Sequence, residues 1–300
     1  MSIFTGVAMS GEPSETIGQI GLGLLGSALA ARLLQAGHAV HGYDTDDATR
    51  TAAAGQGVTP ANRLEELTRH GTIVLCLPSS REVGQVVDAL RPSLAPSTRI
   101  IDTTTGDPTE TALIGEELAG YGINYCDATV AGSSAQVRDA KGVILVGGTA
   151  ETITACDDIL HALAPTVIHV GPCGSGAKMK LVVNLVLGLN RAVLAEGLAF
   201  AERLGLDAGQ ALAALRSTPA YSAAIDAKGE KMVQRDFEPQ ARLRQHLKDV
   251  RLMLAAARRT GARVPLTEQH EALLSQLLDA GFGNEDNSAI LRAFLEGQET

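Results

Sequence analysis

The sequence predicts an α/β protein in which an N-terminal Rossmann domain with a doubly wound sheet is followed by an all-α C-terminal domain. Two observations lead to this prediction. Short apolar runs alternate with amphipathic segments through the first half of the chain, which is typical of right-handed βαβ units around a parallel sheet. Beyond residue 176 the alternation stops, and nearly every segment has the apolar spacing of a helix.

The apolar runs of the first half are predicted strands, because Gly, Pro or Asp residues bound them. They lie at 16–23, 38–44, 72–78, 98–104, 123–130 and 143–148. The first intervening helix, "LLGSALAARLLQAG", ends on Gly37, as a helix C-terminus often does. In the second half, a long apolar segment at 177–205 contains Gly188 and Gly197, which we interpret as sites of close helix packing.

This change of pattern places a domain boundary near Pro172. We expect a mobile extension at 1–15, a Rossmann domain at 16–172, and a helical domain at 173–300. The first residues have no charged segment followed by a long apolar one, so they do not resemble a signal peptide.

Composition narrows the class of protein. The net charge of −9 argues against binding to nucleic acid or to an anionic membrane surface, since both need basic patches. No apolar run reaches the ~18 uncharged residues of a membrane-spanning helix. The 4 cysteines form no CxxC pair and have no zinc-like spacing, so we expect a reduced, cytoplasmic protein without a structural metal.

A dinucleotide-binding pattern follows the first predicted strand. Gly21, Gly23 and Gly26 have the spacing G-x-G-x-x-G where the first helix begins. The first glycine permits a tight turn, the second lets a pyrophosphate approach the backbone, and the third allows the helix to lie against the strand. The helix N-terminus adds N–H groups for the phosphates. The predicted cofactor contacts of this loop are Gly21, Leu22, Gly23, Leu24, Leu25 and Gly26.

Asp44 ends the second predicted strand, about 20 residues after the glycine loop, which is the spacing of the carboxylate that binds the ribose hydroxyls of NAD. An ordinary turn or N-cap aspartate would give the same pattern. Asp46 and Asp47 follow, and Arg50 is the nearby cation. The local charge therefore favours NAD over NADP.

Lys180 and Asn184 lie one helical turn apart in the long apolar segment, so they share a helix face. Lys180 has aliphatic neighbours, whereas Lys178 is expected to point into solvent. Burial and the nearby helix N-terminus both lower the pKa of a lysine, and a value of ~7–8 suits general acid–base catalysis. Asn184 can bind a substrate hydroxyl without competing for its proton. The pair indicates alcohol oxidation by hydride transfer to a nicotinamide, with Lys180 as the proton acceptor.

The segment G-x-x-G-x-G-x-x-x-K-x-x-x-N, from Gly171 to Asn184, resembles the catalytic signature of the β-hydroxyacid dehydrogenase family, which includes 3-hydroxyisobutyrate dehydrogenase. The resemblance runs from Ile17 to about Phe294, through "IGLGLLGSALAARL", "LCLPSS", "IDTTTGDP", "HLKDVRLML" and "GFGNEDNSAI". It implies that Leu77, Pro78 and Thr105 also contact the cofactor. It further implies that Lys248, in the K-D-[LMV] element, reaches the cofactor and substrate cleft.

One segment departs from the family pattern. Where the family has D-A-P-V-S-G-G, whose serine and glycines hold the substrate carboxylate, this chain has "DATVAGS". Ala131 replaces the serine and Ser133 replaces the last glycine. We expect Ala131, Gly132 and Ser133 to contact substrate together with Lys180 and Asn184; alternatively, Ser133 only caps the loop. The headgroup, carboxylate or sulfonate, is left open.

The sequence thus predicts an NAD(P)-dependent oxidoreductase that interconverts a small 3-hydroxy acid and its semialdehyde or keto acid, with Lys180 as general acid and base. In this prediction residues 16–172 bind NAD, and residues 173–300 form the substrate and oligomerisation domain. An imine reductase is one alternative, although such enzymes typically lack the catalytic lysine. A catalytically silent NAD-binding sensor is another, and Ala131 keeps it open. The alanine-rich, glycine-bearing helices of the second half suggest a homodimer or homotetramer.

Overall fold

The chain forms two compact units, unit 1 (Met1–Lys180) and unit 2 (Leu181–Thr300). The structure, a computed structural model, describes residues 15–295. Apart from Glu15, the predicted N-terminal extension lies outside the described residues.

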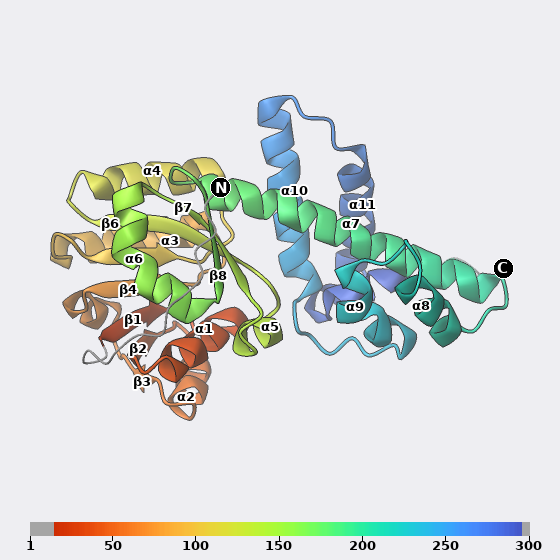
Figure 1. Cartoon of the computed structure of the whole chain (residues 1–300), viewed down its shortest axis with the longest axis horizontal. Helices are drawn as coiled ribbons and strands as arrows, with labels where there is room; N and C mark the ends of the chain where they lie inside the picture. The colour runs from red at the N-terminus through yellow and green to blue at the C-terminus, as the bar shows by residue number, and fades with distance from the viewer. Residues whose placement is uncertain (1–14, 296–300) are drawn as a thin grey trace. The chain divides into compact units, whose positions relative to one another are not determined.

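Unit 1 is built on a sheet with the strand order β3-β2-β1-β4-β5-β6-β7-β8 (Figure 1). All neighbouring strands are parallel except β6 and β7, which are antiparallel. This confirms the predicted doubly wound, mostly parallel sheet, and it adds β3 and β8, which the sequence analysis did not predict. The strands are β1 (Thr16–Ile20), β2 (Ala39–Tyr43), β3 (Thr59–Pro60), β4 (Thr72–Leu75), β5 (Arg99–Asp102), β6 (Asn124–Ala131), β7 (Val143–Gly147) and β8 (Thr166–Gly171).

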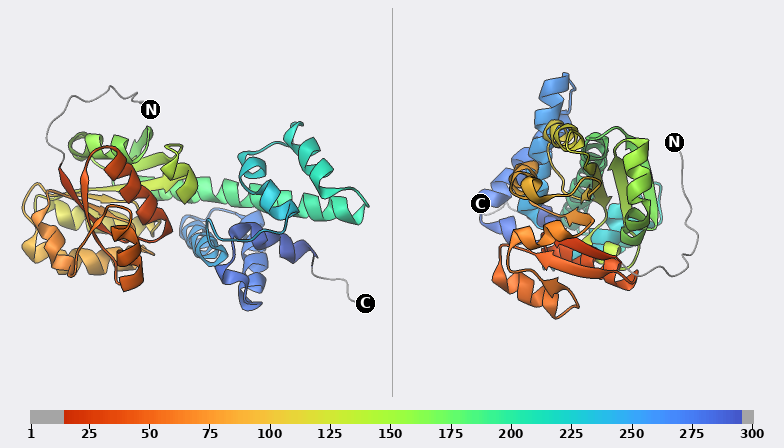
Figure 2. Two further views of the ribbon diagram at one scale, coloured as in Figure 1. Left: turned by 90° about the horizontal axis from the view of Figure 1, so that it is seen from below. Right: turned by 90° about the vertical axis from the view of Figure 1, so that its left-hand side faces the viewer.

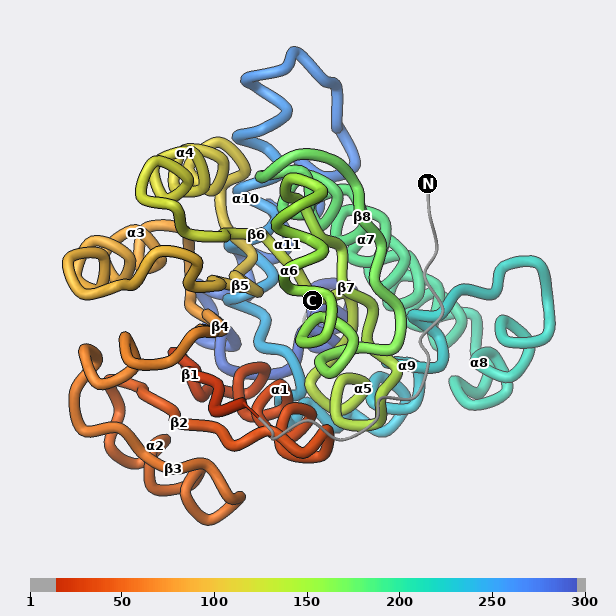
Figure 3. Tube along the Cα trace, turned by 60° about the vertical axis from the view of Figure 1, so that its left-hand side comes forward, coloured from red at the N-terminus to blue at the C-terminus, as the bar shows by residue number. Residues whose placement is uncertain are grey.

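Helices cover both faces of this sheet (Figure 3). On one face, buried side chains of β1, β4, β5 and β6 pack against α1 (Leu24–Gln35) and α6 (Ala150–Leu163), with α2 (Asp47–Ala54) and α5 (Ser134–Arg138) at the same core. On the other face, the alternate side chains of these strands pack against α3 (Ser80–Leu90) and α4 (Pro108–Ala119). The 3-10 turns η1 (Leu64–Arg69) and η2 (Arg91–Ser93) complete the unit. Both faces of every central strand are therefore buried, as the continuous apolar runs require.

Unit 2 is helical, which confirms the predicted all-α second domain (Figure 2). Its long first helix, α7 (Ser175–Arg203), starts within unit 1 and contributes Leu194 and Leu198 to the unit 2 core, beside Leu247 and Leu274. The other long helices of unit 2 form two contacting pairs, α8 with α9 and α10 with α11. The remaining elements are α8 (Ala208–Arg216), α9 (Ala223–Val233), α10 (Leu243–Thr260), α11 (Pro265–Asp279), η3 (Phe282–Asn284), η4 (Asn287–Leu291) and α12 (Arg292–Leu295).

By length and composition alone, α7 is apolar enough to cross a membrane, with a mean hydropathy of 1.5 in its most apolar window. Inside the protein, 44% of that window is buried. Lys180 and Arg191 are also among the buried residues of the helix. We interpret α7 as the core helix of unit 2.

Asp286 fixes the C-terminal part of unit 2 from a fully buried position (0% exposed). Both carboxylate oxygens accept from Lys228 Nζ, at 2.7 and 2.9 Å. Three backbone N–H groups, those of Gln240, Ala241 and Ser288, also donate to the carboxylate. Burial opposes ionisation, but the charge and hydrogen bonds of Lys228 outweigh it and lower the pKa of Asp286. The segment "GFGNEDNSAI", which resembles the C-terminal element of the family, thus supplies Asp286 to a buried ion pair with Lys228.

Gly188 allows two histidines to pack on α7, as the prediction of close helix packing requires. A Cβ at this position would lie 2.6 Å from His246 Nε2 and 3.0 Å from His270 Cε1. The same prediction is wrong at Gly197, where a Cβ would meet open space. The two imidazole centroids are 5.1 Å apart, and His270 is only 3% exposed.

This burial predicts a loss of stability in acid. Burial, with the charge of Arg191, lowers the pKa of His270 from 6.5 to about 4. Because the unfolded chain takes up the proton at the ordinary pKa, the free energy of unfolding falls as the pH drops from 6.5 towards 4, by up to about 1.4 kcal/mol per pH unit. Urea denaturation across this range should show a shallower pH slope for His270→Gln than for wild type. Equal slopes for His270→Gln and wild type would contradict the assignment.

Candidate active site

The glycine loop between β1 and α1 has the geometry predicted for a dinucleotide site. Gly21 has a φ of +91°, and a Cβ there would lie 2.1 Å from the carbonyl oxygen of Cys76. A Cβ at Gly26 would lie 2.1 Å from the Gly21 carbonyl oxygen, so α1 approaches the loop closely. At Gly23 a Cβ meets open space, which is the room that a pyrophosphate needs. The first turn of α1 carries no acidic residue and no side-chain cap, so it offers its N–H groups to an anion.

Gln19 holds this loop in shape from within β1. Its side chain is fully buried (0% exposed), and Nε2 donates to the carbonyl oxygens of Gly26 (2.6 Å) and Gly21 (3.3 Å). The sequence analysis did not identify Gln19. A polar residue inside an apolar strand, directly before the glycines, is the signal that would have found it.

Asp44 follows β2 and is tied to the same loop. Its Oδ2 accepts from the Leu22 N–H at 2.8 Å, and its Oδ1 accepts from the Asp46 N–H at 3.0 Å. Arg50, the possible partner of a 2′-phosphate, donates instead to the Asp47 carboxylate and to the Asp44 carbonyl oxygen. Asp44 therefore places a carboxylate beside the glycine loop, at the position expected for ribose recognition.

The other predicted cofactor residues of unit 1 follow the carboxyl ends of the central strands. Leu77 and Pro78 come after β4, and Thr105 comes after β5. The Leu77 N–H donates to Thr104 Oγ1 at 3.0 Å, which joins these two loops. The strand order reverses between β1 and β4, and ligands of doubly wound sheets bind at such a reversal, outside the carboxyl ends of the strands. The glycine loop, Asp44 and these two loops meet that description.

Asp127 and Gly176 fix the start of α7 against the sheet. Asp127, 1% exposed in β6, accepts from the N–H groups of Gly174 and Ala177, both at 2.7 Å. A Cβ at Gly176 would lie 2.6 Å from the Asp127 carbonyl oxygen, so the approach requires glycine. Burial raises the pKa of Asp127 to about 7, against the lowering effect of these two hydrogen bonds. The sequence analysis missed Asp127, because its partner lies 47 residues away in the chain.

Lys180 is buried, at 8% exposure, and its ammonium points back to the sheet. Nζ donates to the carbonyl oxygen of Val130 in β6 at 2.6 Å. Val130 directly precedes Ala131, so the nitrogen lies beside the loop predicted to contact substrate. Lys178, two residues earlier, is exposed. The two lysines therefore differ as their neighbours in the sequence predict.

The predicted substrate loop runs from Ala131 through Gly132 to Ser133, where α5 begins. Gly132 has a φ of +150°, which favours glycine. Ser133 is the N-cap of α5: Oγ accepts from the Gln136 N–H (3.2 Å), and the Ser133 N–H donates to Gln136 Oε1 (2.8 Å). The Ser133 hydroxyl thus caps the helix, which was the alternative to direct substrate contact.

Asn184 and Lys248, the predicted site residues of unit 2, share one partner. Asn184 is 8% exposed, and its Nδ2 donates to Asp249 Oδ2 at 3.0 Å. Lys248 Nζ lies 3.2 Å from Asp249 Oδ1. Asp249 belongs to the K-D-[LMV] element, but the sequence pattern predicts a role only for Lys248.

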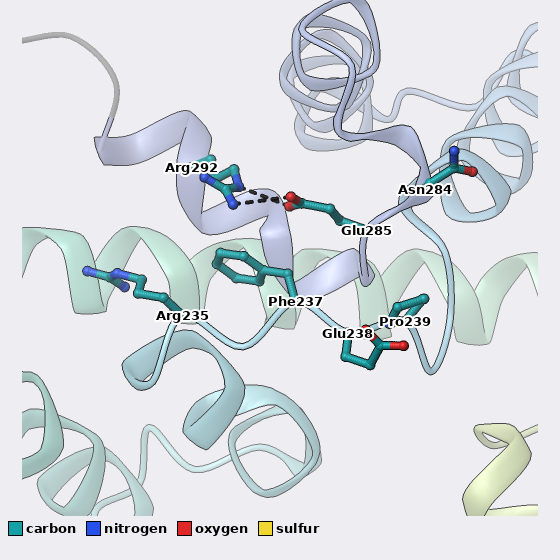
Figure 4. A pocket seen from close by; sticks show the side chains of 7 residues that line it. All are labelled: Arg235, Phe237, Glu238, Pro239, Asn284, Glu285 and Arg292. Atoms are coloured by element: carbon teal, nitrogen blue, oxygen red, sulfur yellow. Dashed lines mark hydrogen bonds and ion pairs between the residues drawn. The ribbon is translucent and has the colours of Figure 1, made fainter.

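A surface pocket of about 360 Å³ in unit 2 contains none of these residues (Figure 4). Arg292 lies over the rings of Phe237 and Phe282, at 4.7 and 4.5 Å from their centroids, and pairs with Glu285. Arg235, on the same pocket wall, pairs with Glu202. Both cations thus have carboxylate partners, and we do not assign the pocket a ligand.

Comparison with known proteins identifies the family over nearly the whole chain. Residues 16–171 match the NAD binding domain of 6-phosphogluconate dehydrogenase, and residues 174–294 match the family described as NAD-binding of NADP-dependent 3-hydroxyisobutyrate dehydrogenase. The chain belongs to the β-hydroxyacid dehydrogenase family. The chain is 27% identical to L-threonate dehydrogenase of Cupriavidus necator, over 94% of this chain and 96% of the relative.

Solved structures show the same fold. The structure of Mycobacterium tuberculosis 3-hydroxyisobutyrate dehydrogenase with L-serine has a TM-score of 0.84 and 26% identity, covering 95% of this chain and 100% of that one. An imine reductase from Pseudomonas sp. has a TM-score of 0.65 and 22% identity, covering 93% of this chain and 99% of that one. The fold of this chain is therefore closer to that of the 3-hydroxyisobutyrate dehydrogenase than to that of this imine reductase.

Proposed function

We propose that this family member is an NAD(P)-dependent oxidoreductase that interconverts a small 3-hydroxy acid and its semialdehyde or keto acid. The observation that carries the proposal is Lys180, a buried ammonium held 2.6 Å from the Val130 carbonyl oxygen beside the 131–133 loop. Residues 16–172 bind the cofactor in this proposal, through a glycine loop with open space at Gly23. Residues 173–300 supply the helical part of the substrate site.

The proposed chemistry needs one proton acceptor close to the substrate hydroxyl. The bound nicotinamide cofactor supplies hydride exchange with the substrate carbon. Lys180, as the neutral amine, accepts the hydroxyl proton during oxidation and returns it during reduction. Asn184, one turn further along α7, hydrogen-bonds the same oxygen and orients it. Gly132 offers its backbone N–H group to the acidic headgroup, since the Ser133 N–H is already engaged by Gln136.

A substrate panel tests this function. The protein is incubated with NAD⁺ or NADP⁺ and with 3-hydroxyisobutyrate, glycerate, threonate or 2,3-dihydroxypropanesulfonate in turn, and formation of the reduced cofactor is followed by absorbance. We expect turnover with at least one compound. The sulfonate distinguishes the two headgroups left open by Ala131. No turnover with any compound or with the matching aldehydes in reverse, despite cofactor binding, would contradict the function and favour the NAD-binding sensor.

The imine reductase alternative is disfavoured by Lys180. An imine reductase has no hydroxyl proton to accept, and enzymes of that kind typically lack this lysine. Here the lysine is present, buried and hydrogen-bonded. Reduction of a cyclic imine at a rate above that of any hydroxy acid would favour the alternative.

We further propose that the cofactor is NAD rather than NADP. The support is the Asp44 carboxylate beside the glycine loop, with Arg50 engaged by Asp47. Asp44→Asn keeps an oxygen for the Leu22 N–H but removes the charge, so we expect the ratio of kcat/KM for NAD⁺ over NADP⁺ to fall about tenfold. Asp46→Asn, which removes a nearby charge, should change the ratio much less. An unchanged ratio in Asp44→Asn would contradict the assignment.

We also propose that the protein is a homodimer or homotetramer joined through α7. Val182, Val186, Val193 and Phe200 lie on one face of this helix and are 58%, 53%, 67% and 63% exposed. A hollow of about 620 Å³ runs along the same face, lined by Val193, Phe200 and Phe294. An apolar stripe of this kind is typical of a buried interface, and a second copy of the chain is the occupant that we propose.

Light scattering with size-exclusion chromatography tests the assembly. We expect a multiple of the 31.2 kDa chain mass for wild type and a shift towards the monomer for Phe200→Glu. Leu266→Glu is the matched control, because Leu266 is 69% exposed on α11 and does not line this hollow. A wild-type protein of single-chain mass would contradict the proposal.

A cytoplasmic location is proposed from the cysteines. The 4 cysteines of the chain are free thiols in the structure. Burial raises the pKa of Cys76 to about 11 and that of Cys173 to about 12, so both are expected to be inert. Free, unreactive thiols fit a reducing compartment.

A further inference from the structure

Asn184 and Asp249 form a buried side-chain pair that joins two helices of unit 2. Asn184 lies on α7 and Asp249 on α10, and they are 8% and 7% exposed. Asn184 Nδ2 donates to Asp249 Oδ2 at 3.0 Å. Both side chains are thus shielded from water. In such surroundings a hydrogen bond to an ionised group is strong and fixes the geometry of its donor.

The chemistry of this pair is directional. An ionised carboxylate only accepts hydrogen bonds, whereas an amide presents a donor on one side and an acceptor on the other. Asn184 can therefore turn its NH₂ group towards Asp249, but turning its carbonyl oxygen that way would bring two partial negative charges together. The carboxylate selects one of the two amide orientations.

Two cations keep Asp249 suited to this role. Lys248, its neighbour on α10, lies 3.2 Å from Oδ1. Arg191 on α7 is 5% exposed, and burial lowers its pKa to about 10. The negative charges of Asp286 and Asp249 oppose this lowering, so Arg191 also interacts electrostatically with Asp249. Both cations attract the Asp249 carboxylate electrostatically.

We infer that Asp249 is a positioning residue that fixes the amide of Asn184 for the substrate. With Nδ2 directed at Asp249, the Asn184 carbonyl oxygen and the second amide hydrogen remain for the ligand. The orientation is then set before substrate arrives, which lowers the entropy cost of reaching the reactive geometry. This inference rests on the proposed function, since it assigns Asn184 a part in turnover.

A double-mutant cycle on kcat tests the inference. Asn184→Ala is expected to lower kcat by about 10–100-fold. Asp249→Asn has the same volume but offers Asn184 either an oxygen or an NH₂ group, so both amide orientations are allowed and we expect kcat to fall about tenfold. In the Asn184→Ala background, the fold loss of kcat caused by Asp249→Asn should be at least about threefold smaller than in the wild-type background. Equal factors in both backgrounds would overturn the inference.

A matched control separates positioning from a general effect of losing an ion pair. Glu271 pairs with Arg251, which lies two residues after Asp249 on α10, at 3.0 Å. Glu271→Gln removes this pair without touching Asn184, and it should leave kcat within about twofold of wild type. If Glu271→Gln lowers kcat as much as Asp249→Asn does, the effect is structural and the inference fails.

A second readout does not depend on activity. The side-chain NH₂ resonances of Asn184, assigned by their absence in Asn184→Ala, should exchange slowly with solvent in the wild-type protein because the donor is engaged. Faster exchange in Asp249→Asn supports the inference, and unchanged exchange overturns it. If exchange responds but Asn184→Ala turns over at the wild-type rate, the pair exists and the proposed role of Asn184 in turnover is the part that fails.

Discussion

Replacing Lys180 by methionine is expected to lower kcat by about 10²–10⁴-fold while NAD⁺ binds with nearly unchanged affinity. Methionine keeps the length and apolar character of the side chain, so the buried position stays filled. What it removes is the nitrogen that lies 2.6 Å from the Val130 carbonyl oxygen, beside the 131–133 loop. Steady-state turnover of the best substrate from the panel, with cofactor affinity from fluorescence titration, measures both quantities.

Lys178 provides the control for this variant. It lies two residues before Lys180 on the same helix, but it is exposed. Lys178→Met should leave kcat within about twofold of wild type, because a solvated lysine is not part of the site. A Lys180→Met protein that turns over at the wild-type rate would remove the proposed mechanism.

Replacing Asp286 by alanine is expected to destabilise unit 2 by about 3–5 kcal/mol. Asp286 is 0% exposed, and its carboxylate accepts from Lys228 at 2.7 and 2.9 Å. Without it, Lys228, 7% exposed, becomes a buried charge without its ion-pair partner, and the N–H groups of Gln240 and Ala241 lose an acceptor. Urea denaturation followed by circular dichroism measures the change in the free energy of unfolding.

Two further variants define the cause. Asp236, an exposed carboxylate, pairs with Lys231 at 2.9 Å, and Asp236→Ala should destabilise unit 2 much less than Asp286→Ala does. Replacing both members of the buried pair, Lys228→Met with Asp286→Ala, should recover part of the stability, because no unpaired charge is left. If the double variant is less stable than Asp286→Ala alone, the account of an uncompensated charge is wrong.

The parts of the fold that the sequence predicts are those governed by local rules. The glycine spacing predicts a tight turn at Gly21 and close packing at Gly26, and a Cβ at either position would clash with a carbonyl oxygen 2.1 Å away. Continuous apolar runs predict the central strands, which are buried on both faces. The two edge strands of the sheet follow these rules less well, and the sequence did not predict them. The strand β3 has only two residues, including Pro60, and the apolar run of β8 is interrupted by a half-buried His169.

The site residues divide in the same way. Lys180 stands out in the sequence because a charged residue interrupts an aliphatic helix face, and its burial follows from its neighbours. Gln19 can be recognised only as a polar residue inside an apolar strand, whereas Asp127 and Asp249 act through partners that only the folded chain brings near. Asp127 caps a helix that begins 48 residues later, and Asp249 meets Asn184 across 65 residues. Polar residues inside apolar strands or helices indicate such contacts, but the partner requires the structure.

Chemical rescue of Lys180→Ala is the most direct test of the central claim, which is that one buried amine transfers the proton. The shortened side chain leaves space beside Val130, and small primary amines added to the assay can enter it. We predict that methylamine and ethylamine restore part of the lost turnover in proportion to the concentration of free amine. Turnover that stays at the level of the variant with every amine, while the cofactor still binds, would contradict the account.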